Sequence, residues 1–198
     1  MRSVINLITV AAVGVLVGSV VTDVAAQSGG PDGRGFVLPT WGVLPDEAAA
    51  LIEKGDVLVG NQAYGEAREY YEDAAVLIRA DDGFPSLPLR RIAESYYFEG
   101  RYQTSIAALD ALAEEAAEFG DVLTQAWARA DAAWVLWVDC ERKDRPVHNP
   151  EMARRATQLR RLLASPYLPV EDAEQIWVKR CGGCHPGEEF ARKPIAGR

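Results

Sequence analysis

A pattern of a large, a small and a second large residue recurs at intervals of 38 positions through the middle of the chain. Its three copies are Leu51, Gly55 and Leu58; Leu89, Ala93 and Tyr96; and Trp127, Asp131 and Trp134. Residues spaced four and three positions apart lie on one face of an α-helix. A small residue in the middle of that face lets a second helix approach closely, and the large residues fill the space beside it. The recurrence therefore predicts a series of similar helix pairs.

A second set of positions recurs at the same interval and predicts the partner helices. Tyr64, Ala67, Tyr71 and Ala74 return as Tyr102, Ser105, Leu109 and Leu112. A third, less regular pair is expected, with its first helix over 122–140 and its second beginning at Asn149-Pro150, a favourable N-cap and first-turn pair. These patterns resemble the tetratricopeptide repeat, whose usual period is 34 residues. The resemblance implies an all-α fold, a short tetratricopeptide-like α-solenoid of about three helix pairs over residues 44–168.

The same resemblance implies a protein partner. Tetratricopeptide proteins usually bind other proteins in the concave groove that their first helices line. Four residues stand at such first-helix positions here: Asp56, Arg90, Glu94 and Tyr97. They are expected to face the partner.

Near the end of the chain, Cys181-Gly182-Gly183-Cys184-His185 has the C-x-x-C-H spacing that covalent attachment of c-type haem requires. Two thiols three positions apart can bond to the two vinyl groups of one porphyrin, and the adjacent histidine can bind the iron. The residues before the motif, 171–180, predict a short helix. With Ile176-Trp177 just ahead of the cysteines, segment 171–189 resembles the N-terminal haem-binding helix of class I cytochromes c. Residues 169–198 are therefore predicted to form a tail that carries one covalent haem c, with Cys181 and Cys184 as anchors and His185 as axial ligand.

The second axial ligand is not evident from this segment. Class I cytochromes continue for several dozen residues and supply a distal methionine, whereas only residues 186–198 follow the motif here. His148, the other histidine of the chain, is the candidate metal ligand; otherwise the iron is five-coordinate or a partner chain supplies the ligand. A tetrahedral zinc site made by Cys140, His148, Cys181 and Cys184 is the alternative. A Cys181–Cys184 disulfide is a further alternative, although it leaves His185 without a role.

The N-terminal segment has the features of an export signal. Arg2 precedes a mostly apolar stretch over 4–21, and Val24-Ala25-Ala26 offers small residues for cleavage. Residues 1–26 are thus predicted to be a signal peptide or, if uncleaved, a signal anchor, and the Gly- and Pro-rich residues 27–43 a flexible linker. Export to the periplasm agrees with the motif, because thiol pairs outside the cytoplasm become oxidised unless something occupies them.

The charge distribution restricts the function further. A formal net charge of −8 argues against nucleic-acid binding. Segment 142–161, which includes Arg160, is mainly basic and segment 110–121 is acidic. These are either solvated helix faces or a dipole whose basic side lies near the haem propionates or an acidic redox partner. No constellation of catalytic residues is present, so the chain is not expected to be an enzyme. The sequence predicts an exported monohaem electron-transfer protein whose repeats dock a protein partner. The alternative is a periplasmic scaffold or assembly protein in which the C-x-x-C-H run holds zinc or a disulfide.

Overall fold

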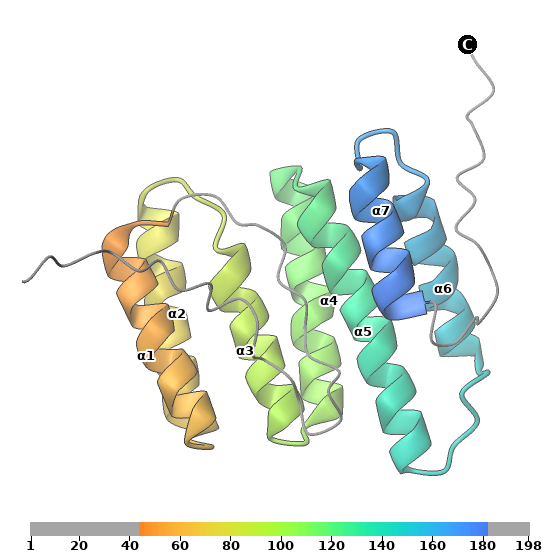
Figure 1. The fold of residues 1–198 in the computed structure, drawn as a ribbon, viewed down its shortest axis with the longest axis horizontal. Helices are drawn as coiled ribbons and strands as arrows, with labels where there is room; N and C mark the ends of the chain where they lie inside the picture. Colours follow the sequence, from red (N-terminus) through yellow and green to blue (C-terminus); the bar gives the residue numbers. More distant parts are fainter. Residues whose placement is uncertain (1–43, 182–198) are drawn as a thin grey trace, which may run out of the picture. The chain divides into compact units, whose positions relative to one another are not determined.

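The computed structural model describes residues 44–181, all of which lie within one compact unit (Figure 1). This part of the chain consists of helices joined by turns and contains no β-strand, which confirms the all-α fold class for it. The elements are α1 (Asp46–Gly60), α2 (Tyr64–Ala80), α3 (Ser86–Phe98), α4 (Tyr102–Phe119), α5 (Val122–Arg142), α6 (Pro150–Leu163), α7 (Val170–Ile176) and the π-helix η2 (Trp177–Cys181). None of these helices is long and apolar enough to cross a membrane.

Each helix packs against its neighbours in the sequence. The helices α1 to α6 lie side by side in chain order, and each contacts the one before and the one after it (Figure 1). Helix α7 and η2 then return to contact α5 rather than extending the row. The result is that α5 lies against α4, α6 and the C-terminal elements together.

The ends of the helices are defined by backbone conformation and by side-chain caps. Gly120 ends α4 in the left-handed region, with φ of 84°, where a glycine has no steric cost. The next residue, Asp121, caps α5: its carboxylate accepts a hydrogen bond from the Thr124 backbone N–H at 2.9 Å. At α6, the Asn149 side chain accepts a bond from the Met152 backbone N–H at 2.9 Å, and Pro150 takes the first helical position. The predicted start of α6 is therefore confirmed.

Close approach of α1 and α2 depends on the absence of a side chain at Gly55. A Cβ atom at this position would lie 2.4 Å from Cε1 of Tyr71 on α2, much closer than carbon atoms can approach. Ala93 lies at the corresponding position of α3 and is fully buried. Asp131, the third member of this series, is also fully buried on α5. A charged residue there has to be compensated by partners, and these partners lie at the candidate site.

Candidate cofactor pocket

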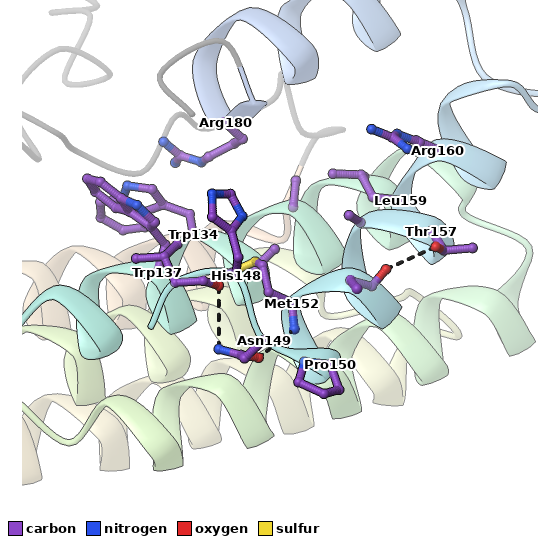
Figure 2. Close-up of a pocket in the computed structure, with 15 residues that line it drawn as sticks. Trp134, Trp137, His148, Asn149, Pro150, Met152, Thr157, Leu159, Arg160 and Arg180 are labelled. Atoms are coloured by element: carbon purple, nitrogen blue, oxygen red, sulfur yellow. Dashed lines mark hydrogen bonds between the residues drawn. The ribbon is translucent and has the colours of Figure 1, made fainter. Parts of the chain in front are cut away.

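A pocket lies between α5, α6, the loop that joins them, and the end of η2. It encloses about 570 Å³, a size typical of cofactor and ligand sites. Figure 2 shows the side chains that surround it. They are mostly apolar: Ala130, Ala133, Trp134, Trp137, Val147, His148, Asn149, Pro150, Met152, Ala153, Ala156, Thr157, Leu159, Arg160 and Arg180.

Helical periodicity explains how α5 and α6 form the walls. Ala130, Trp134 and Trp137 are four and three residues apart and so lie on one face of α5. Met152, Ala156 and Leu159 follow the same spacing on α6. Both walls therefore carry alanines beside larger residues.

The loop between these helices brings His148 to the pocket. Its side chain is exposed, and Figure 2 shows the imidazole directed into the pocket on the side where Arg180 lies. Within the described residues, the imidazole makes no hydrogen bond or ion pair. The neighbouring Asn149 is held firmly, since its side-chain nitrogen donates to the Pro146 carbonyl at 3.0 Å while its oxygen caps α6. The loop thus fixes the position of the backbone next to His148, whose imidazole nitrogen can bind a metal ion.

Arg180 closes the pocket from η2 and is anchored to α5 by a buried ion-pair cluster. Its Nε atom lies 2.6 Å from Oδ1 of Asp131, and Nη2 of Arg90 lies 2.8 Å from Oδ2 of the same carboxylate. The side chains of Asp131, Arg90 and Arg180 are 0%, 2% and 4% exposed. The Arg180 guanidinium also lies over the Trp134 ring, 4.9 Å from its centroid. We call these three residues the Asp131 cluster.

The Asp131 cluster fixes the backbone immediately before the cysteine motif. Helix η2 ends at Cys181, directly after Arg180. The preceding turn is held by apolar contacts as well, because Ile176 is fully buried and Trp177 packs against the same group of core residues on α5 and α6. The expected helix ahead of the motif is therefore present, as α7 followed by η2. Cys184 and His185 lie outside the described residues.

Cys140 and His148 line different pockets. Cys140 is buried near the end of α5 and borders a smaller space of about 370 Å³ together with Gln103 and Arg145. The Asn149 side-chain nitrogen lies 3.6 Å from its sulfur. Among the described residues, no group of three or more His, Cys, Asp or Glu side chains could hold a metal ion.

The residues expected to line a partner groove are mostly buried. Arg90, Glu94 and Tyr97 are 1%, 2% and 7% exposed, and only Asp56 is partly open. Burial raises the pKa of the Glu94 carboxyl, although Arg91 lies 2.7 Å from Oε2 and acts in the opposite direction. Asp56 accepts a hydrogen bond from the Tyr71 hydroxyl at 2.7 Å. Arg90, Asp56 and Tyr97 thus contact neighbouring helices in this structure, which the sequence did not predict.

The basic and acidic segments are partly paired with each other. Arg155 of α6 is buried, with Nη2 2.6 Å from Oδ2 of Asp110 on α4, and Arg129 of α5 contacts Oδ1 at 2.6 Å. The interpretation of the basic segment as a solvated helix face is therefore wrong at Arg155, which is buried. Arg160 differs, because it lies at the pocket and forms no ion pair within the described residues.

Comparison with known proteins does not assign the chain to a family. No protein-family model matches the chain, and no curated protein or solved structure is significantly similar to it. Sequence reasoning identified His148 and, as part of the basic segment, Arg160, but it missed the Asp131 cluster as part of the site. One signal was available for the cluster: a charged residue, Asp131, stands where the first two copies of the pattern have Gly55 and Ala93.

Proposed function

We propose that the protein is an exported carrier of one c-type haem that transfers electrons to and from a protein partner. The observation that carries the proposal is the C-x-x-C-H run, which begins at the last residue of η2, next to Arg180 on the rim of the pocket. Cys181 and Cys184 would bond to the porphyrin, and His185 would bind the iron.

The chemistry of the pocket fits such a group. Its volume of about 570 Å³ and its apolar walls suit a large hydrophobic cofactor. Trp137 is partly exposed at the pocket and offers an aromatic surface beside a planar ring, and His148 offers an imidazole nitrogen for iron. Arg160 provides a cation near the pocket that can pair with the carboxylates of a porphyrin.

When bound, haem iron supplies a one-electron couple, so that each electron accepted from a reduced protein is passed to an oxidised one. The apolar walls would limit the access of water to the ring and so influence its reduction potential. The anchored η2 would hold the attachment site at a constant position. We find no set of side chains in the described residues that assigns the protein a catalytic reaction.

We further propose that α1 to α6 form three helix pairs of a short tetratricopeptide-like solenoid that docks the partner. Two observations support it. Helices α2 and α4 begin at Tyr64 and Tyr102, 38 residues apart, and the small residues Gly55 and Ala93 are buried between paired helices. The partner would be a protein of the respiratory or photosynthetic electron-transfer class, located with this protein in the periplasm or at the membrane that bounds it.

The test is production of the full chain in a host that matures c-type cytochromes, followed by denaturing extraction. Covalent haem would add about 0.6 kDa and give a visible absorption band that survives extraction. The Cys181→Ala and Cys184→Ala variants should lose most of this attachment, whereas Cys140→Ala, a cysteine outside the motif, should retain it.

A colourless protein, obtained alongside a control cytochrome that matures normally, would contradict the proposal. Metal analysis and thiol titration would then distinguish the zinc site from the disulfide. Either result would favour the alternative function, a periplasmic scaffold or assembly protein. Binding of a partner protein should then survive Cys181→Ala.

A further inference from the structure

We propose that the pocket between α5 and α6 receives the face of the haem opposite His185, and that His148 is the second axial ligand of the iron. This inference rests on the haem attachment proposed above and adds to it the residues that complete the coordination. The helices would thereby supply the second side of the haem site.

The position of η2 brings the haem attachment site to the edge of the pocket. The covalent motif starts directly after Arg180, and Arg180 itself lines the pocket. Because the Asp131 cluster anchors Arg180 to α5, the attachment point cannot move far from the pocket without breaking a buried ion pair. A porphyrin bonded at Cys181 would therefore lie next to this space.

The surroundings of His148 also favour ligation. Its imidazole is directed into the pocket, is exposed, and makes no hydrogen bond with any described residue, so ligation would break no existing contact (Figure 2). The backbone beside it is already ordered by the Asn149 cap of α6 and by a bond from the Asn149 N–H to the Val147 carbonyl at 3.1 Å. A preordered loop reduces the entropy that ligation costs.

Met152 is the rival ligand within the same pocket. It lies in the first turn of α6 and is half-buried, and a thioether is a common partner of histidine on haem iron. Met152 also packs against a group of buried residues that includes Trp134 and Val138. Using its sulfur as a ligand would withdraw the side chain from this packing, whereas ligation by His148 would not, so the structure favours His148.

The experiment uses the full chain with haem attached and compares His148→Ala with Met152→Leu. We expect His148→Ala to open one coordination position. The reduced protein should then bind carbon monoxide rapidly, the absorption spectrum should change to that of a five-coordinate or water-ligated haem, and added imidazole should restore the original spectrum. Met152→Leu should bind carbon monoxide no faster than the unsubstituted protein, with an unchanged spectrum.

Other outcomes would overturn the inference in distinguishable ways. If Met152→Leu opens the iron and His148→Ala does not, the ligand is the thioether. If the unsubstituted protein already binds carbon monoxide rapidly and neither change alters its spectrum, the pocket supplies no ligand. Both results require that haem is attached, so they contradict this inference without contradicting the haem-carrier function, which fails only if the protein is colourless.

Discussion

The Nε atom of Arg180 lies 2.6 Å from Oδ1 of Asp131, in a contact where both side chains are almost fully buried. It joins residues 49 positions apart, one in the middle of α5 and the other directly before the cysteine motif. Removing two charges from water is costly, and a pair in this environment is retained only when geometry and further contacts compensate. Here the second carboxylate oxygen pairs with Arg90, so one anion is shared by two cations from different helices.

The first prediction concerns this shared anion. Asp131→Ala should lower the free energy of unfolding by about 3–5 kcal/mol, because two buried guanidinium groups lose the carboxylate between them. Chemical denaturation monitored by circular dichroism measures the change. The control is Glu115→Ala, which removes an ion pair with Arg79 in which both side chains are more than one-third exposed. That change should cost less than about 1 kcal/mol. Equal losses of unfolding free energy in the two variants would show that burial does not increase the contribution of the Asp131 cluster to stability.

The second prediction concerns the close approach of α1 and α2. Gly55→Ala should destabilise the protein by about 1–3 kcal/mol, because the added methyl would overlap the Tyr71 ring. Gly60→Ala is the matched control at the end of the same helix, where an added Cβ meets nothing within 4 Å. This control should be neutral or stabilising by about 0.5 kcal/mol, since alanine is the better helix former. Thermal and denaturant unfolding of both variants would test the contrast, and a neutral Gly55→Ala would contradict the packing argument.

The helices were predictable from the sequence because their signals are local. Asn149-Pro150 marks the start of α6 through a side-chain cap and a fixed φ angle, and both depend only on neighbouring residues. The spacing of Gly55 and Ala93 predicted buried small residues because helical periodicity places them on one face. Such features require no knowledge of which helices meet.

The pairing of charges was not predictable in the same way. Arg155 and Asp110 are 45 positions apart, and their contact depends on how α6 packs beside α4 and α5. Likewise, the basic composition of segment 142–161 gives no indication that Arg155 is buried while Arg160 remains exposed at the pocket. The pocket itself lies between two helices and a loop, and depends on how these elements pack rather than on any local pattern. His148 was identifiable as a candidate ligand only because histidine is rare in this chain.

The third prediction concerns acid stability and Asp110. Burial raises the pKa of the Asp110 carboxyl, but the hydrogen bonds and charges of Arg155 and Arg129 outweigh burial, so that the pKa lies below its ordinary value. A carboxyl with a lowered folded-state pKa stabilises the protein above the unfolded-state pKa of about 4, and this contribution is lost as the pH falls through the folded-state value. Asp110→Asn should therefore reduce stability at pH 7 and flatten the decline of stability below about pH 4.

Unfolding curves measured from neutral to acidic pH would test this dependence. Glu118→Gln is the control on the same helix: it removes an exposed carboxylate that forms no ion pair within the described residues. This variant should follow the pH dependence of the unsubstituted protein. If Asp110→Asn retains the same acid-dependent decline, then other carboxylates account for it and the pairs with Arg155 and Arg129 are too weak to matter.

The fourth prediction concerns the cation at the pocket and applies to the haem-loaded protein. A positive charge near haem favours the reduced state, which carries one positive charge less, and so raises the reduction potential. Arg160→Gln should accordingly lower the potential, by on the order of tens of millivolts for a solvent-exposed charge. Arg161→Gln removes the same charge one residue further along α6, outside the pocket, and should leave the potential nearly unchanged.

Potentiometric titration at low and high salt separates the two effects, because ions screen the distant charge more completely. Equal shifts for both variants would mean that the net charge of the surface, rather than the position of Arg160 at the pocket, sets the potential.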